Sequence, residues 1–165
     1  MSFYIPIFKL LNKEEVKYVV VGGIATILHG YVRATADIDL VVDLQADEAT
    51  KVIDALTQAG FIPKIPVEAL EFVDKTKRKQ WIEAKGMQVF SMYNPAQPAL
   101  TIDLFVEYPI PFDELWLRSV VMDLGETTVR VCSIDDLMMM KRDAGRHKDL
   151  ADIEQLTKIK DYEKE

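Results

Sequence analysis

A short, fully apolar segment that ends at a pair of glycines is the feature that most constrains this chain. Tyr18-Val19-Val20-Val21 is rich in β-branched residues, as expected of a strand buried on both faces. It stops at Gly22-Gly23, and residues 24–29 then read as a helix with Gly30 as its C-terminal stop. The glycine pair would let the backbone approach a ligand closely, and the free N–H groups of the helix start would suit a phosphate. A purely structural tight turn is the alternative interpretation.

Two carboxylates stand at the entry to a second apolar strand, predicted over residues 38–42. Asp37 and Asp39 are two residues apart, so strand geometry places both on one face, with Ile38 pointing into the core. Like charges on one face repel each other, and a hard divalent cation between them would offset that repulsion. A solvated strand end is the alternative, but Leu40-Val41-Val42 follows directly, and we favour a metal site.

A third carboxylate, Asp103, lies within the apolar strand predicted over residues 100–106. A charge at such a position is costly unless it is paired or bound to a metal. If this strand lies beside the strand of Asp37 and Asp39, three carboxylates converge, as in a two-metal site for phosphoryl chemistry. Pairing of Asp103 with a basic residue is the alternative.

The remaining pattern alternates strands with helices and ends in two helices, which predicts an α/β (α+β) fold with a mixed sheet flanked by helices. Residues 65–85 give no clear pattern. We expect one domain over residues 1–165, with its core at about 14–108 and a C-terminal helical part at about 133–160. Further strands are expected at 61–62, 87–93 and 128–131, and helices at 47–59, 112–119, 133–144 and 148–160.

Composition and charge exclude several classes of function. The net charge of −7 disfavours broad, non-specific binding to nucleic acid. Cys132 is the one cysteine, which excludes an internal disulfide and multi-cysteine zinc sites. Residues 1–6 lack the pattern of a signal peptide, and no apolar run is long enough for a membrane span. We therefore expect a cytoplasmic protein without a membrane partner.

The order and spacing of these short blocks resemble a known signature. Val21-Gly22-Gly23, Asp37-Ile38-Asp39-Leu40 and Ile102-Asp103-Leu104 are similar to the motifs of the nucleotidyltransferase superfamily with the polymerase-β-type fold. The segments 33–39 and 137–156 resemble the branch of AbiEii-like, toxin-type nucleotidyltransferases and their uncharacterised relatives. The second glycine-motif position is often serine in the superfamily, and Gly23 lacks that hydroxyl.

The resemblance implies a role for each matching residue. Asp37 and Asp39 would hold divalent ions, two Mg²⁺ with Mn²⁺ as an alternative, and Asp103 would complete the metal site and help to deprotonate the acceptor hydroxyl. Nucleotide binding would fall to six residues: Gly22, Gly23, Arg33, Lys141, Arg146 and Lys148. The acceptor hydroxyl would attack the α-phosphorus of a nucleoside triphosphate, and pyrophosphate would leave.

Some of these residues have equally simple structural explanations. Arg33 could contact triphosphate or pair with an aspartate, and Lys141 could be a helix-surface lysine. Asp149 and Asp152 suit the first turn of a helix, and Asp149 could also order Arg146 or Lys148.

Two hypotheses of function follow. The first is a metal-dependent transferase acting on a small molecule, a protein or an RNA end, within a toxin–antitoxin-like system. The second is a catalytically weak or inactive relative that binds a nucleotide or a partner. The short chain leaves little room for an acceptor-binding domain, which favours a protein partner or a homo-oligomer that supplies one.

Overall fold

A computed structural model describes residues 3–165 of the chain. In that range seven strands form one mixed sheet in the order β3-β4-β5-β2-β1-β7-β6. Its central strands β2 and β5 run parallel, as do β1 and β7, and the remaining neighbours are antiparallel. The strands are β1 Tyr18–Val21, β2 Asp37–Val42, β3 Ile62–Pro63, β4 Val89–Asn94, β5 Gln97–Phe105, β6 Val120–Asp123 and β7 Thr128–Val131.

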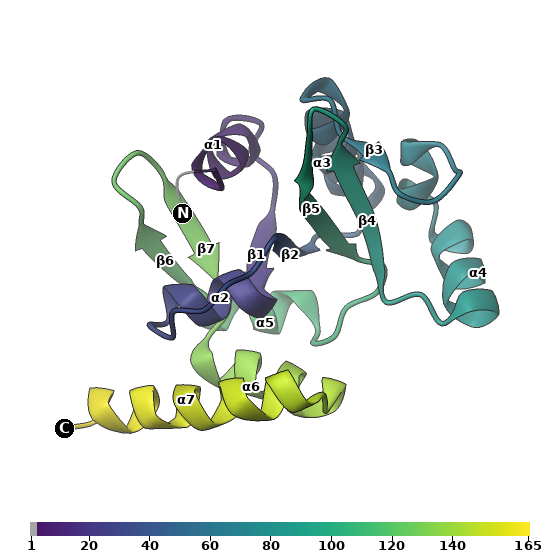
Figure 1. The fold of residues 1–165 in the computed structure, drawn as a ribbon. Helices are drawn as coiled ribbons and strands as arrows, with labels where there is room; N and C mark the ends of the chain where they lie inside the picture. The colour runs from purple at the N-terminus through teal and green to yellow at the C-terminus, as the bar shows by residue number, and fades with distance from the viewer. Residues whose placement is uncertain (1–2) are drawn as a thin grey trace.

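Helices cover both faces of this sheet. Figure 1 shows α1 and α3 on one side and α2, α6 and α7 on the other, with α7 running along the outside of α6. The predicted mixed α/β fold flanked by helices is therefore confirmed. The helices are α1 Ile5–Lys13, α2 Gly22–Leu28, α3 Ala46–Gln58, α4 Lys75–Lys85, α5 Phe112–Arg118, α6 Ile134–Ala144 and α7 His147–Glu163, with a 3₁₀ helix η1 at Ala69–Val73.

The core follows the hydrophobic patterns of the sequence. All four residues of β1 are buried, as its unbroken apolar run predicts. The apolar stripe of α3 is buried against the sheet. In α6 the Ser133 hydroxyl accepts a hydrogen bond from the backbone N–H of Asp136, and Gly145 ends the helix in the left-handed conformation, so both predicted ends are confirmed.

Several element boundaries differ from the expectation. The helix predicted from residue 24 begins at Gly22, so both glycines lie in its first turn and not in a loop before it. Residues 65–85, which gave no clear pattern, form η1 and α4. The link between the strands predicted at 87–93 and 100–106 is shorter than expected, because β5 already starts at Gln97. Helix α1 and the edge strand β6 were not anticipated.

The single cysteine sits at the junction between the sheet and α6. Cys132 is fully buried, and its backbone N–H continues the β1–β7 pairing by donating to the Val20 carbonyl. Its own carbonyl oxygen lies 2.8 Å from Nε2 of His29 at the end of α2. His29 therefore has a packing role, as a lone histidine usually does.

Candidate active site

The three aspartates lie on the two central parallel strands. In the pairing of β2 with β5, Asp39 stands directly opposite Asp103 and Asp37 opposite Thr101. The intervening residue of each strand, Ile38 or Ile102, points the other way and is fully buried in the core. Because residues paired across strands share a face, the three aspartates occupy one face of the sheet. The structure thus brings these predicted residues together.

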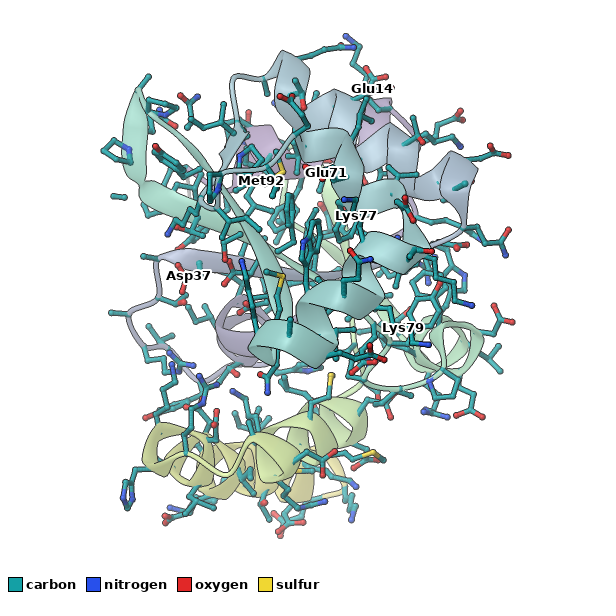
Figure 2. All side chains as sticks on the ribbon, turned by 90° about the vertical axis from the view of Figure 1, so that its right-hand side faces the viewer. Glu14, Asp37, Glu71, Lys77, Lys79 and Met92 are labelled. Atoms are coloured by element: carbon teal, nitrogen blue, oxygen red, sulfur yellow. The ribbon has the colours of Figure 1, made fainter. Side chains whose placement is uncertain are left out.

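Burial and mutual repulsion perturb the acids of this cluster. The pKa of Asp39 is raised from 3.8 to about 7, first by burial and then by the negative charges of Asp103 and Asp37. Burial likewise raises the pKa of Asp103, although a hydrogen bond from Ser91 opposes that shift. Asp37 is exposed at the start of β2, well apart from the lysines of α4 that are labelled in Figure 2.

Two further side chains extend the row, and sequence reasoning missed both. On β4, the Ser91 hydroxyl donates to Oδ1 of Asp103 at 2.6 Å, and Ser91 stands opposite Asp103 in the strand pairing. The backbone N–H of Lys64, directly after β3, donates to the Ser91 carbonyl at 2.9 Å. The charge of Lys64 reaches Asp103 and acts to lower its pKa. Neither residue has a sequence signal, because both are brought here by pairing between distant strands.

The first glycine of the pair makes room for one of the aspartates. Gly22 has a φ of +68°, and a Cβ placed on it would lie 2.2 Å from Oδ2 of Asp39. A side chain at this position would therefore clash with the carboxylate in addition to straining the backbone. The Gly23 backbone also acts to lower the pKa of Asp39, against the effect of burial.

The second glycine permits close packing of the segment before β2. A Cβ on Gly23 would lie 2.8 Å from Oγ1 of Thr35 and 3.3 Å from a terminal nitrogen of Arg33. Thr35 is held from the other side by the Tyr4 hydroxyl, which donates to its carbonyl at 2.5 Å. The glycine pair is thus required by the packing of the site itself, whatever it contributes to a ligand.

An ionic cluster built on two buried aspartates holds three of the predicted cations beside the carboxylates. Lys141, on α6, is only 5% exposed, and its Nζ lies 2.8 Å from Oδ2 of Asp152, on α7. The same Oδ2 accepts a hydrogen bond from Arg33 at 2.9 Å. Lys141 is thus buried and paired with an aspartate, so the alternative of a helix-surface lysine is wrong. Arg33 forms a salt bridge with the same aspartate, as its alternative interpretation stated.

Asp149 and Arg146 complete this cluster. Asp149, which is 1% exposed, accepts hydrogen bonds from the Arg146 guanidinium at 2.7 and 3.3 Å and lies 4.0 Å from Nζ of Lys141. Asp149 therefore holds the Arg146 side chain in place, as the sequence suggested. The charges of Lys141 and Arg146 both reach Asp39. Lys148 is exposed in the first turn of α7 and takes no part in these contacts.

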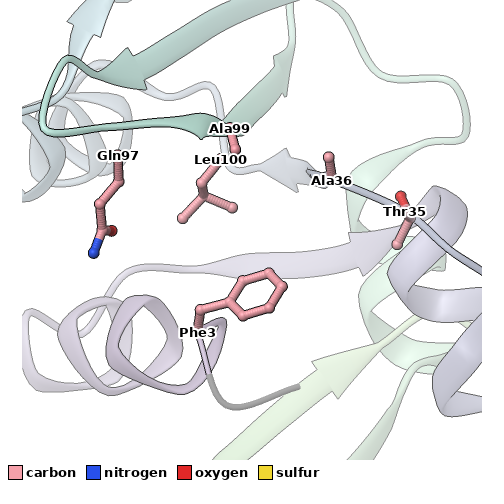
Figure 3. Close-up of a pocket in the computed structure, with 6 residues that line it drawn as sticks. All are labelled: Phe3, Thr35, Ala36, Gln97, Ala99 and Leu100. Atoms are coloured by element: carbon pink, nitrogen blue, oxygen red, sulfur yellow. The ribbon is translucent and has the colours of Figure 1, made fainter.

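A small apolar pocket of about 280 Å³ lies next to the start of β2. Phe3, Leu100 and Ala36 form much of its wall, with Thr35, Gln97 and Ala99 around them (Figure 3). Because Ala36 directly precedes Asp37, the pocket adjoins the carboxylate cluster along the chain. Leu100 alternates with Thr101 and Asp103 along β5, so its side chain lines the pocket on the opposite face of the sheet from the acids.

The donor set suits a hard divalent cation. Three carboxylates share one face, two of them side by side, and carboxylate oxygens are the ligands that such cations favour. Within residues 3–165, however, no group of three or more histidine, cysteine, aspartate or glutamate side chains is arranged so that it could hold a metal ion as it stands. The part of the chain that the structure describes also contains no helix with the length and apolar character needed to cross a membrane.

Comparisons with known proteins agree with this geometry. Residues 7–163 match the model of a family described as "Nucleotidyltransferase of unknown function (DUF6036)". The chain therefore belongs to this nucleotidyltransferase family and is a transferase. A comparison with curated proteins gives no match.

A solved structure shares the fold over nearly the whole chain. The lincosamide antibiotic adenylyltransferase LnuA, with lincomycin bound, superposes with a TM-score of 0.63 at 17% sequence identity. The match covers 96% of this chain and 95% of that chain. This likeness supports the nucleotidyltransferase fold expected from the sequence.

Proposed function

We propose that this protein transfers a nucleoside monophosphate from a nucleoside triphosphate to a hydroxyl acceptor, in a reaction that depends on Mg²⁺. One observation carries the proposal: Asp39 and Asp103 stand side by side on parallel strands, with Asp37 on the same face and three cations next to them. Membership of a nucleotidyltransferase family supports the class of reaction.

Each group of residues has a distinct task in this proposal. Asp37, Asp39 and Asp103 would hold the Mg²⁺ ions, for which Mn²⁺ is an alternative. Bound there, the metal would stabilise negative charge on the triphosphate. Asp103 would accept the proton of the acceptor hydroxyl, whose oxygen forms a bond to the α-phosphorus as the bond to pyrophosphate breaks.

The ionic cluster would receive the leaving group. Arg33, Lys141 and Arg146 are paired with only two aspartates, so the net charge of the cluster is positive. A positive cluster beside the metal site suits the negative charge that develops on pyrophosphate.

The remaining nucleotide-binding predictions are weaker in the structure. Gly22 and Gly23 could offer backbone N–H groups to a phosphate, but both are also required by the close packing against Asp39 and Thr35. Lys148 can reach a ligand only from the surface of α7. We therefore assign the triphosphate primarily to Arg33, Lys141 and Arg146.

Calorimetry with each nucleoside triphosphate, with and without Mg²⁺, tests the proposal. We expect binding only with the metal, and loss of binding in Asp39→Asn. Asp54→Asn is the matched control, because it removes the same charge from an exposed position on α3. If no triphosphate binds the folded protein, the proposal is wrong.

A binding protein without transferase activity is the second hypothesis from the sequence, and an assay of pyrophosphate release separates the two. Triphosphate binding without any release of pyrophosphate, in the presence of bulk tRNA, cell extract or a partner, would favour it. The presence of all three carboxylates on one face favours an active enzyme.

The AbiEii-like branch and a toxin–antitoxin context extend the proposal further. They are supported by the short blocks at 33–39 and 137–156, and the ionic cluster joins residues of both blocks. If this assignment is right, expression of the chain alone will slow growth, and Asp39→Asn will relieve the effect. A partner or a second copy would then supply acceptor contacts. The adenylyltransferase of similar fold makes ATP the first triphosphate to test.

A further inference from the structure

A row of polar side chains continues from the three aspartates to the edge of the sheet. Strand pairing places Asp39 opposite Asp103 and Asp103 opposite Ser91. Lys64 directly follows Pro63, the last residue of β3 that pairs with β4, and its N–H donates to the Ser91 carbonyl at 2.9 Å. The positive charge of Lys64 also reaches Asp103, which places its ammonium group near the carboxylates.

The two sides of Asp103 differ in the elements and the charged residues that surround them. The cations assigned to the triphosphate come from the segment before β2 and from α6 and α7. Helix α2 packs on β1, β2 and α6, on that same side. The opposite side consists of β4 and β3, where Met92 points into the core, Ser91 faces the carboxylates, and Lys64 follows the end of β3. An acceptor that reaches Asp103 from the side away from these cations therefore comes over β4 and β3.

Lys64 gives this second side its charge. Its side chain is exposed, and among the residues that the structure describes it takes part in no ion pair. Strands are spaced by about 4.8 Å, so the Lys64 backbone lies about 10 Å from that of Asp103 along the row. The length of a lysine side chain brings its ammonium group closer than this to a hydroxyl held at Asp103.

We propose that the acceptor binds over β4 and β3 and carries an anionic group, a phosphate or a carboxylate, which Lys64 binds while the acceptor hydroxyl contacts Asp103. This proposal rests on the proposed function, since it names the class of acceptor for the same reaction. The acceptor's hydroxyl and anion lie within a few bonds of each other, so a small hydroxy-phosphate or hydroxy-acid unit satisfies both contacts.

Amide NMR on the ¹⁵N-labelled full chain tests this proposal directly. The protein is first saturated with Mg²⁺ and a non-hydrolysable triphosphate analogue, so that added anions cannot occupy the triphosphate site. Glycerol 3-phosphate, glycerate and glycerol are then titrated separately. We expect one or both anions to shift the amides of Ser91 and Lys64, and glycerol to leave them unchanged. The two anionic probes show whether phosphate or carboxylate is preferred.

Lys64→Gln supplies the decisive comparison. We expect the variant to bind the anionic probe about tenfold more weakly, because a charge-assisted contact is lost. Lys51→Gln, on α3, is the matched control and should bind as the unaltered protein does. Anion binding that survives Lys64→Gln, or no anion binding at all, would overturn the proposal.

Two other outcomes are informative and distinct. If Lys64→Gln weakens binding of the triphosphate analogue instead, Lys64 serves to balance the charge of the carboxylates, and the acceptor proposal is wrong. If the analogue does not bind the unaltered protein in Mg²⁺, the proposed function itself fails. The first step of the titration therefore tests the function, and the second tests the acceptor.

Discussion

Gly22 and Asp39 form the tightest residue-level constraint in this protein. The absence of a side chain at Gly22 provides the space that the Asp39 carboxylate occupies, and the φ of +68° adds a conformational reason for glycine. The glycine motif and the Asp-x-Asp motif are therefore a single steric unit, even though the rest of α2 and the segment after it separate them along the chain.

Replacing Gly22 by alanine should disturb both stability and the site. The new Cβ would lie 2.2 Å from Asp39 Oδ2, so the carboxylate or the helix start must move. We expect a loss of about 2 kcal/mol in the free energy of unfolding and loss of Mg²⁺-dependent triphosphate binding. Urea unfolding and calorimetry measure the two effects.

Gly125→Ala is the control for this variant. Gly125 also has a positive φ, but no atom lies within 4 Å of the added Cβ. The control should therefore lose some stability through backbone strain and keep its triphosphate binding. If Gly22→Ala binds triphosphate as the control does, the steric unit is not required by the site.

Ser91 should act through Asp103. Its hydroxyl holds Oδ1 of that carboxylate at 2.6 Å, which leaves the other oxygen to contact the acceptor. We expect Ser91→Ala to lower turnover about tenfold with an unchanged KM for the triphosphate, and Ser91→Thr to restore much of the rate. Steady-state kinetics provide the measurement. Equal losses in the alanine and threonine variants would argue against a positioning role.

The three aspartates could be found in the sequence because strand alternation and apolar neighbours can be read locally. Ser91 and Lys64 were missed, since their place depends on which strands pair and in which register. The shared partner of Lys141 and Arg33 was missed for a similar reason. Asp152 was recognised as an acid in a helix turn, but its two cations come from separate elements.

Among the secondary-structure elements, the ionic cluster connects α6, α7 and the segment before β2 through salt bridges. Asp152 is buried and accepts from both Lys141 and Arg33, so a single carboxylate links three parts of the chain. Buried ions of this kind are costly to separate, because removal of one partner leaves the others without compensation.

We therefore expect Asp152→Asn to destabilise the protein by about 3 kcal/mol and to weaken triphosphate binding. Urea unfolding gives the first quantity and calorimetry the second. Glu154→Gln is the control on the same helix, where an exposed pair with Lys158 should contribute less than about 0.5 kcal/mol. Similar losses in both variants would contradict the special role of Asp152.

Elements with an unbroken apolar run or a clear cap were predictable, as β1 and α6 show. Helix α1 was not predicted, although four of its apolar residues are buried. Of residues 1–6, which lack the pattern of a signal peptide, residues 1 and 2 lie outside the described part of the chain. Strand β6 is an edge strand with exposed Val120 and Val121, so burial left no alternating pattern to detect.

At the scale of the whole molecule, the carboxylate cluster should make stability depend on pH. The pKa of Asp39 is about 7 in the folded state, against a usual value of 3.8. Between these values the folded protein binds more protons than the unfolded chain, so raising the pH lowers the free energy of unfolding. The stabilisation is fully present below the unfolded pKa and is lost as the pH rises through about 7.

We expect the thermal midpoint, measured in a chelator, to fall between about pH 5 and pH 8, by an amount equivalent to on the order of 1–3 kcal/mol. Asp39→Asn should flatten this dependence, whereas Asp54→Asn should leave it intact. Added Mg²⁺ should oppose the fall, since a cation stabilises the ionised carboxylates. A midpoint that rises with pH in the chelator would contradict the assignment.

Because Cys132 is buried, labelling of its thiol can report when the folded protein opens, without any substitution in the chain. The thiol is fully enclosed where β7 meets α6, and burial raises its pKa, so it is both inaccessible and unreactive in the folded state. Labelling by a thiol reagent therefore requires the sheet and α6 to separate. At low reagent concentration the labelling rate follows the fraction of open molecules, and it should fall when Mg²⁺ and a triphosphate are bound. Mass spectrometry can follow the added mass over time, with no engineered probe.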